Sequence, residues 1–315
     1  MRRQCASAIL PSTRDRAAGL TYGATFNMES AMTETLSADD AQDDTAPAKP
    51  AKKEENFFVF LAKLVLIVVI FRSFVFAPFN IPSESMLPRL ENGDYLLAAK
   101  WPYGFSSFSL PFSIPLIPGR FFAHQPKRGD VVIFKAPPTD DDDYIKRVIG
   151  LPGDQIQMVD GQVHINGKAV PKVRVANKEI AVSPNTHCYA PVFERENRYE
   201  VTKPDGTRVC SYPQFRETLP NGKSYLVLDL ENTAQDNTPV YVVPQGALFL
   251  MGDNRDNSLD SRFPAFPKQG IGLVPQANLI GRATIVMFST DGSAVWYKPW
   301  TWFTAARWDR IGGTF

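Results

Sequence analysis

The longest apolar run of the chain spans residues 57–77, FFVFLAKLVLIVVIFRSFVFA. A helix needs about 20 apolar residues to cross a bilayer, and this run reaches that length only if Lys63 and Arg72 are tolerated. Both lie near an end of the run, where a long basic side chain can extend its charge to the headgroups. The pattern therefore predicts one N-terminal transmembrane helix. The alternative is a cleaved secretory signal, because residues 75–77 resemble a small-x-small cleavage site. The long segment before the run and Pro78 after the scissile bond favour the anchor.

The segment before this run, residues 1–56, is rich in Ala, Thr, Ser, Asp and Pro and has few large apolar residues. Such a segment cannot bury enough apolar surface to offset the entropy of ordering, so we expect a disordered cytoplasmic tail. Its true start is either Met1 or Met28. Basic residues at the end of the tail leave residues 78–315 on the outer face of the inner (plasma) membrane. These basic residues are Lys49, Lys52 and Lys53.

Beyond residue 77, short runs of alternating or apolar residues predict strands, and no helical period of useful length follows. Asp160-Gly161 and Asn166-Gly167 are strong hairpin signals between two of these runs. The chain from 171 to 240 is more polar, and we expect an inserted β subdomain at about residues 155–243. The pattern predicts a mostly β, antiparallel fold. The expected strands are 94–99, 130–134, 144–149, 155–159, 162–165, 239–243, 247–251 and 279–288.

Two segments are rich in aromatic residues. Residues 101–122 combine them with several prolines and almost no charge. A core strand would not carry so many prolines, and an exposed apolar loop marks an interaction surface. Beside a membrane anchor the expected partner is the lipid bilayer, and the alternative is a loop packed on the protein's own core. Residues 296–308 hold four tryptophans among basic residues. Tryptophan is favoured at membrane interfaces, with core packing again as the alternative.

The net charge of the 315 residues is +1, which gives no indication of a nucleic-acid partner. Three cysteines are present without C-x-x-C spacing, so we expect no metal and no cofactor. Cys188 and Cys210 lie in the part predicted to face an oxidising compartment. They therefore either form a disulfide or remain two free thiols, and the sequence does not decide between these outcomes.

A first candidate for chemistry is the Pro-bounded turn NIPSESMLP at residues 80–88, which holds Ser83 and Ser85. Prolines stiffen the backbone, so this turn can present a serine rigidly to a substrate lying in the membrane. Taken alone, a simple surface turn is the commoner interpretation. A nucleophilic serine also needs a base, and none of the three histidines lies in a recognisable catalytic context.

A lysine can act as that base when burial lowers its pKa. Lys146 lies in the predicted strand YIKRVIG, where alternation places Tyr144, Lys146 and Val148 on one face and Arg147 on the other. From this strand alone, a solvated lysine is the better interpretation. A third segment, GDNRDNSLDSR at residues 252–262, is dense in hydrogen-bonding groups, and such a loop is costly unless it orders something. Its alternatives are a surface loop or a calcium site, although the ligating Glu of an EF-hand is missing.

The motifs IPSxSMxP, YIKRVxGLPGD and GDNRDNSxDSR, in this order after an anchor, resemble those of bacterial type I signal peptidases. The resemblance runs from about residue 57 to the C-terminus and is weakest between 171 and 240. It implies a β-barrel-like antiparallel catalytic core with an inserted β subdomain. It also implies a membrane-anchored serine endopeptidase that removes signal peptides from exported preproteins after Ala-x-Ala motifs.

The resemblance further implies a Ser/Lys dyad, with Ser85 as the nucleophile and Lys146 as the general base. The Ser85 N–H and the Ser83 hydroxyl would form the oxyanion hole, and Ser258 would orient the lysine amine. The residues that would form ion pairs behind the site are Arg147, Asp253, Asp260 and Arg262. The residues that would line small apolar substrate pockets are Phe79, Ile81, Met86, Leu90, Tyr144 and Ile145.

Glu84 and Arg89 depart from the family's pattern, because small or neutral residues are common at these positions. In an extended segment Glu84 alternates away from Ser83 and Ser85, and we expect both Glu84 and Arg89 to be exposed. Two other functions are consistent with the sequence. One is a related Ser/Lys peptidase with a dedicated substrate, such as a pilin. The other is a non-catalytic, membrane-tethered β scaffold, which would not need Ser85, Lys146 and Ser258 together.

Overall fold

The computed structural model describes residues 56–189 and 198–315. The predicted disordered tail therefore lies outside the described residues, except for Asn56. Helix α1 (Phe57–Phe74) begins where the Asn56 side chain accepts a hydrogen bond from the Phe58 N–H at 3.0 Å. It is the one described helix that is long and apolar enough to cross a membrane.

Helix α1 ends earlier than the predicted span of residues 57–77. The chain turns at Val75 and enters strand β1 (Phe76–Asn80). Pro78 explains the change, because a proline disfavours the helical conformation of the residue before it and blocks a hydrogen bond of the helix. Strand β1 lies at the edge of its sheet, which is where a proline is tolerated. At 1.5 Å per residue the helix is about 27 Å long, close to the hydrocarbon thickness of a bilayer.

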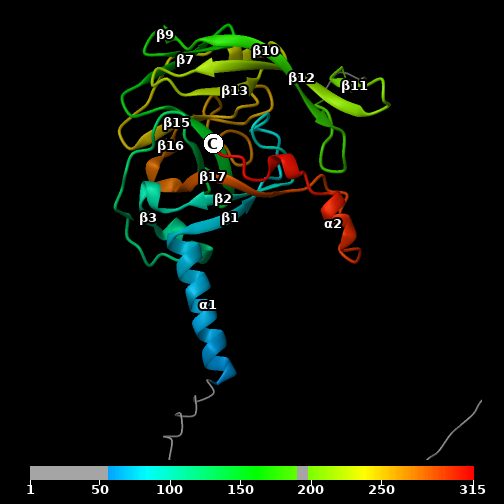
Figure 1. Cartoon of the computed structure of the whole chain (residues 1–315). Helices are drawn as coiled ribbons and strands as arrows, with labels where there is room; N and C mark the ends of the chain where they lie inside the picture. Colours follow the sequence, from blue (N-terminus) through cyan, green and yellow to red (C-terminus); the bar gives the residue numbers. More distant parts are fainter. Residues whose placement is uncertain (1–55, 190–197) are drawn as a thin grey trace, which may run out of the picture. The chain divides into compact units, whose positions relative to one another are not determined.

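The main sheet has seven strands in the order β1-β2-β17-β5-β6-β15-β16, and all neighbours are antiparallel. It curls into an open half-barrel above α1 (Figure 1). The predicted antiparallel, mostly β fold is thus confirmed. The remaining strands of this sheet are β2 (Asp94–Ala99), β5 (Val131–Lys135), β6 (Asp143–Gly150), β15 (Ala247–Met251), β16 (Val274–Pro275) and β17 (Leu279–Ser289).

The chain between β6 and β15 forms two further sheets, which lie at the far end of the half-barrel from α1 (Figure 1). The first has the order β14-β7-β8-β9, and in the second β12 pairs with β10, β11 and β13. The strands of the first sheet are β7 (Gln155–Val159), β8 (Gln162–Ile165), β9 (Lys168–Ala169) and β14 (Tyr241–Val242). Those of the second are β10 (Lys172–Ala181), β11 (Glu200–Thr202), β12 (Arg208–Thr218) and β13 (Ser224–Leu228). The subdomain boundary at about residues 155–243 stays a prediction.

A disulfide between Cys188 and Cys210 joins the chain before the undescribed segment to strand β12, with the two Cα atoms 5.2 Å apart. Of the two outcomes that the sequence left open for these cysteines, the structure has the disulfide. The sulfurs lie in a small core with Tyr199 and Tyr212, away from the main sheet.

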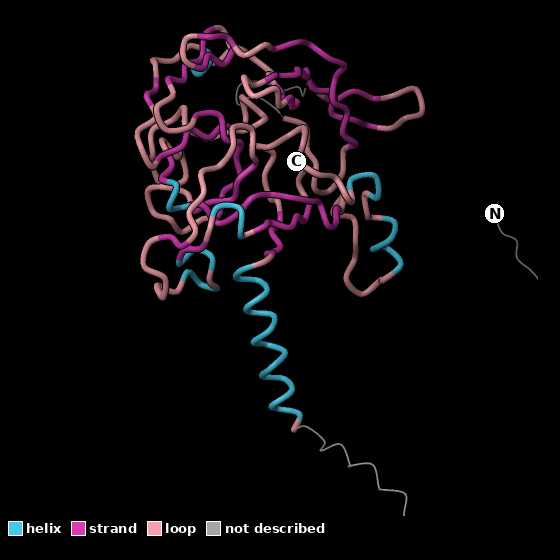
Figure 2. Tube along the Cα trace, turned by 60° about the vertical axis from the view of Figure 1, so that its left-hand side comes forward, coloured by secondary structure: helices cyan, strands magenta, loops and turns pink. Residues whose placement is uncertain are grey.

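The two aromatic segments differ in how much they expose. In the first segment, Tyr103 is buried in the protein's own core, whereas Phe112, Leu116 and Phe122 are mostly exposed, and contact of the exposed part with a lipid bilayer stays a prediction. This segment contains the short hairpin of β3 (Phe105–Ser106) and β4 (Arg120–Phe121). In the second segment, the alternative that the tryptophans pack in the core is wrong, because all four are 49–82% exposed. Both segments lie on the side of the body from which α1 leaves (Figure 2). The second contains the short, unpredicted helix α2 (Trp300–Thr304).

Candidate active site

The serine turn follows the edge strand β1, and its Met86 and Leu90 pack into the core of the half-barrel. Ser85 is 8% exposed, and its carbonyl accepts a hydrogen bond from the Asn254 N–H at 3.1 Å. The Asn254 side chain donates to the neighbouring Glu84 carbonyl at 3.2 Å. A Cβ on Gly252 would lie 2.5 Å from the Ser85 carbonyl, so only glycine permits this close approach. The loop at 252–262 therefore holds the serine turn in place.

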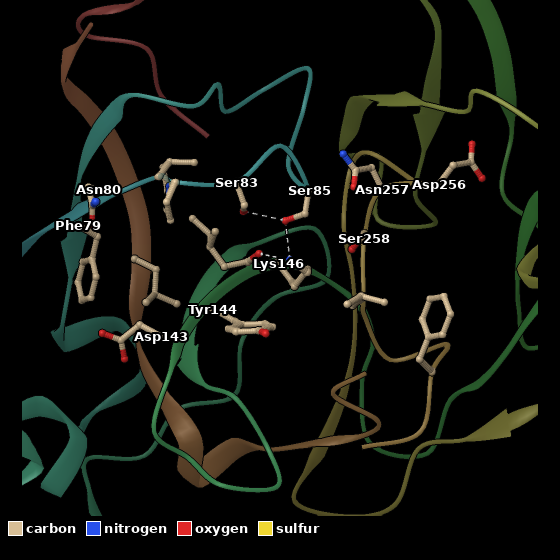
Figure 3. A pocket seen from close by; sticks show the side chains of 16 residues that line it. Phe79, Asn80, Ser83, Ser85, Asp143, Tyr144, Lys146, Asp256, Asn257 and Ser258 are labelled. Carbon is tan, nitrogen blue, oxygen red and sulfur yellow. Dashed lines mark hydrogen bonds between the residues drawn. The ribbon is translucent and has the colours of Figure 1, made fainter. Parts of the chain in front are cut away.

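Lys146 reaches the same point from strand β6. Its Nζ donates to Ser85 Oγ at 2.7 Å and to the Ile145 carbonyl at 3.0 Å (Figure 3). Ser83 Oγ lies 3.5 Å from Ser85 Oγ on the other side. Ser85 and Lys146 are 61 residues apart in sequence. The serine turn and strand β6 thus bring the Ser85 hydroxyl and the Lys146 amine into direct contact.

Lys146 is only 4% exposed, and this burial lowers the pKa of its amine to about 8. Removal from water disfavours the charged form, and the negative charges of Asp260 and Asp253 offset part of that effect. The amine is therefore neutral in a large fraction of molecules slightly above neutral pH. A neutral amine can accept a proton, which a fully charged lysine cannot.

The four charged residues expected behind the site form two buried ion pairs. Arg147 leaves the opposite face of β6 and binds Asp253 through two hydrogen bonds of 2.7 and 2.6 Å. Asp260 binds Arg262 at 2.9 and 3.0 Å and also accepts the Gly252 N–H at 3.0 Å. These pairs fix the shape of the 252–262 loop. The predicted orientation of Arg147 toward Asp253 is found in the structure.

A cavity of about 480 Å³ opens beside the Ser85–Lys146 contact (Figure 3). Its walls come from β1 and the serine turn, from β5 and β6, and from the 252–262 loop and Phe263. The predicted pocket residues that line it are Phe79, Ile81, Tyr144 and Ile145. Further lining residues, which the sequence did not single out, include Asn80, Ile133, Asp143, Asn257 and Leu259.

A family model described as signal peptidase, peptidase S26, matches residues 55–288 of the chain. The chain is 36% identical to a signal peptidase I of Rickettsia typhi over 79% of its own length and 84% of that protein. A similar protein of Rickettsia conorii, also a signal peptidase I, is 36% identical over 77% of this chain and 81% of that one. This chain belongs to the signal peptidase S26 family. Among solved structures, a signal peptidase I of Enterococcus faecalis V583 matches with a TM-score of 0.25 and 23% identity, covering 50% of this chain and 97% of that one.

In this signal peptidase family member, three sequence-based expectations about the site need correction. Ser258 lines the cavity, but its buried hydroxyl makes no hydrogen bond to a described residue, so it does not orient the Lys146 amine here. The Lys146 amine instead donates to Ser85 Oγ and to the Ile145 carbonyl. Met86 and Leu90 are fully buried in the core beneath the serine turn and do not line the cavity.

Glu84 is half-buried, which contradicts the expected exposure, whereas Arg89 is exposed as expected. The turn does not continue as a regular extended strand, so alternation fails at this position. Burial raises the pKa of Glu84, and the charge of His187 offsets part of that rise. The Glu84 carboxylate accepts a long hydrogen bond of 3.4 Å from Asn257.

Sequence reasoning also missed a third buried ion pair of this peptidase fold. Arg255 binds Glu217 of strand β12 at 2.8 and 2.6 Å, and the Tyr225 hydroxyl donates to the same carboxylate at 2.7 Å. This pair ties the 252–262 loop to the second small sheet. The density of hydrogen-bonding groups in the loop was the available signal, but no pattern pointed to Glu217 as a partner.

Among the described residues, Asp229, Asp236 and Asp256 bring carboxylate oxygens within 4.8 Å of one another. The Lys172 ammonium already binds Asp229, and Asp256 accepts the Leu230 N–H at 2.6 Å. Burial raises the pKa of Asp256 to about 6, and the backbone N–H of Leu230 lowers it. The lysine thus supplies positive charge to the cluster, and we assign no metal to it.

Proposed function

We propose that this protein is a membrane-anchored serine endopeptidase that cleaves N-terminal signal peptides from exported preproteins after Ala-x-Ala motifs. Ser85 and Lys146 are its catalytic dyad. The observation that carries the proposal is the 2.7 Å hydrogen bond from a buried, readily neutralised lysine amine to a serine hydroxyl at the wall of a cavity. Membership of a family of signal peptidases supports the substrate class.

In the proposed reaction, the neutral Lys146 amine takes the proton of Ser85 Oγ while that oxygen attacks the carbonyl carbon of the scissile bond. The resulting oxyanion accepts hydrogen bonds from the Ser85 N–H and the Ser83 hydroxyl, each worth about 3 kcal/mol. The Lys146 ammonium then gives its proton to the leaving amine as the peptide bond breaks. A water molecule, deprotonated by the same amine, hydrolyses the acyl-enzyme and restores the serine.

Substrate selection follows from the cavity walls. Phe79, Ile81, Tyr144 and Ile145 surround the space beside Ser85 with apolar groups. Side chains the size of alanine at the first and third positions before the cut fit such small apolar pockets, whereas charged ones would lose their hydration without a partner. Met86 and Leu90 support these walls from the core beneath.

The lipid bilayer is the second proposed partner. Helix α1 would cross the inner membrane once, with the N-terminus in the cytoplasm and the catalytic body on the outer face. The last turn of α1 contacts the body through Phe74, whose ring lies 5.1 Å from that of Phe105. This short connection would keep the cavity close to the membrane surface, where the cleavage site of a signal peptide emerges.

The test is cleavage of a peptide that contains an Ala-x-Ala site by the purified full-length chain. We expect Ser85→Ala and Lys146→Met each to abolish cleavage, with the protein still folded and bound to membranes. The double variant should lose no more than either single variant, because the two residues act as one unit. Lys203→Met removes a partly exposed lysine that directly follows strand β11 and should keep full activity. Substantial turnover by either dyad variant would rule out this mechanism, and an inactive native protein would favour a non-catalytic scaffold.

A further inference from the structure

Lys100 is a buried lysine that the proposed reaction does not use. It follows strand β2, and its N–H donates to the Val75 carbonyl at 3.0 Å, where the chain passes from α1 to β1. The residue is 4% exposed. Alternation along β2 places its side chain on the same inner face of the half-barrel as Leu96 and Ala98, which belong to the core under the cavity.

The Lys100 ammonium has three N–H donors but makes no hydrogen bond or ion pair within the parts of the chain that the structure describes. Its Nζ lies over the face of the Phe79 ring, 5.8 Å from the ring centre. Asp143 is the acidic group close enough to influence it, but the Asp143 carboxylate is paired with Lys135 at 2.9 Å. The side chain is largely removed from water, and its ammonium has no acceptor among the described residues, so an oxygen atom from outside the chain can fill that role.

The charged groups around Lys100 do not supply that acceptor. Arg72 of α1, Arg120 of β4 and Lys135 of β5 are all positive, and Asp143 of β6 is the opposing charge. Burial lowers the pKa of Lys100 to about 8, and the Asp143 carboxylate offsets part of that effect. At neutral pH the ammonium therefore stays mostly charged and attracts oxygen atoms with partial negative charge.

The location of Lys100 indicates what brings such oxygens. Phe79 and Asp143, which lie next to it, are both cavity-lining residues. From Ser85, the cavity wall runs back through Ile81 to Phe79 along β1. Strand β1 continues to Phe76, which pairs with Ala99 directly before Lys100. Lys100 thus lies beyond the proposed pocket for the third residue before the cut, toward the end of α1.

We propose that Lys100 is a substrate-positioning residue, whose ammonium donates hydrogen bonds to backbone carbonyls of the signal peptide upstream of the third residue before the cut. This inference rests on the proposed function, because it needs a substrate strand that runs from Ser85 along β1 toward the membrane. Backbone carbonyls are present whatever the side chains are. Lys100 therefore holds the approaching segment without restricting its sequence, and the apolar pockets retain the selection of small residues.

The test compares two peptides with the same Ala-x-Ala site, one with only the three site residues before the cut and one with about eight residues before it, a difference of about 16 Å in an extended strand. Full-length protein in a non-ionic detergent is assayed as the native chain, as Lys100→Met and as the control Lys127→Met. The control removes the same charge from an exposed loop. We expect Lys100→Met to raise KM for the long peptide about tenfold, as the loss of a charged hydrogen bond does, with kcat unchanged. The short peptide and the control should behave like the native protein.

A stability measurement separates positioning from a structural role. Replacing an unpartnered buried ammonium by an apolar side chain of similar length should leave the midpoint of thermal unfolding unchanged or raise it. A clearly lower midpoint, or an equal loss of activity on both peptides, would mean that Lys100 supports the fold and not the substrate.

A lipid headgroup is the competing source of an acceptor oxygen. The same assays in phosphatidylglycerol vesicles address it: a defect of Lys100→Met that appears only in vesicles, and not in detergent, would overturn the proposal in favour of a lipid phosphate. Cleavage of both peptides by Lys100→Met at native rates would overturn the Lys100 inference alone. If the native protein cleaves neither peptide, the proposed function and the inference both fail.

Discussion

At the residue scale, the site depends on how one lysine amine is held. Lys146 has 4% exposure, and its two hydrogen-bond acceptors are the Ser85 hydroxyl and a backbone carbonyl. The apolar strand around it could be recognised from the sequence, and so could the need for a lowered pKa. Its direct contact with Ser85 could not, because the two lie 61 residues apart and only the family resemblance joined them.

We predict that activity rises with pH through the ionisation of Lys146. The amine must be neutral to accept the serine proton, and burial lowers its pKa from about 10.4 in free lysine to about 8. The active form is therefore scarce below that pH and dominant above it. The specificity constant kcat/KM should be measured on the short peptide, so that the ionisation of Lys100 does not affect the pH profile. A profile that stays flat between about pH 6 and 10 would place the base elsewhere.

The matched variant for this prediction is Lys146→Arg. It keeps a positive charge at the site, but a guanidinium does not give up its proton in proteins. We expect no cleavage at any pH, with the protein still folded. An active arginine variant would show that a charged group suffices and that proton transfer to this residue is not part of the reaction.

At the scale of elements, the 252–262 loop couples the serine turn to the second small sheet through buried ion pairs. We predict that Glu217→Gln lowers the free energy of unfolding by about 3–5 kcal/mol, because it leaves the buried Arg255 guanidinium uncompensated. Both side chains are at most 2% exposed, so solvent does not screen the charge. Denaturant unfolding of the full-length protein in detergent measures the change.

The control is Glu200→Gln, which removes the partner of Arg208 in the same sheet. Those side chains are 29% and 59% exposed, so this pair should contribute at most about 1 kcal/mol. If both variants lose the same stability, the Glu217–Arg255 pair acts as an ordinary surface pair and does not hold the loop.

Comparison of individual elements shows where the sequence pattern was informative. Strands β2, β7, β8 and β15 have the predicted bounds, because each is a short apolar or alternating run, and the hairpin signal Asp160-Gly161 fixes two of them. Strand β10 was missed, since it is exposed over much of its length and carries no clear alternation. Strand β14 keeps only two of five predicted residues, because its pairing with β7 is brief.

The predicted pocket residues have two different outcomes. Phe79 and Tyr144 were assigned to the cavity by family resemblance and do line it. Met86 and Leu90 were assigned in the same way, but the core takes them because apolar side chains under a turn are buried whenever space permits. Lys100 carries no local signal at all, since only the assembled half-barrel shows that it is buried and has no ion-pair partner among the described residues.

At the scale of the whole molecule, the two aromatic segments, residues 101–122 and 296–308, lie on the side from which α1 leaves the body (Figure 2). Phe112 and Phe122 in the first segment are 97% and 77% exposed, and Trp296 and Trp300 in the second are 82% and 66% exposed. Large apolar groups that gather on one side of a protein mark an interaction surface. The two segments flank the proposed anchor, so a bilayer crossed by α1 would meet both of them.

We therefore predict that the catalytic body binds lipid without α1. A form that begins at Val75 keeps strand β1 whole, whereas one that begins at Phe79 would remove half of this edge strand and disturb the cavity wall. The Val75 form should sediment with phosphatidylglycerol vesicles. Replacing Phe112, Phe122, Trp296 and Trp300 together by serine should abolish that binding, since each aromatic ring buried in the bilayer contributes about 1.5–3 kcal/mol.

Cleavage of the short peptide in solution should persist in the fourfold variant, because none of these side chains lines the cavity. A Val75 form that ignores vesicles and stays monomeric without detergent would mean that α1 alone holds the protein at the membrane. The aromatic segments would then need another partner.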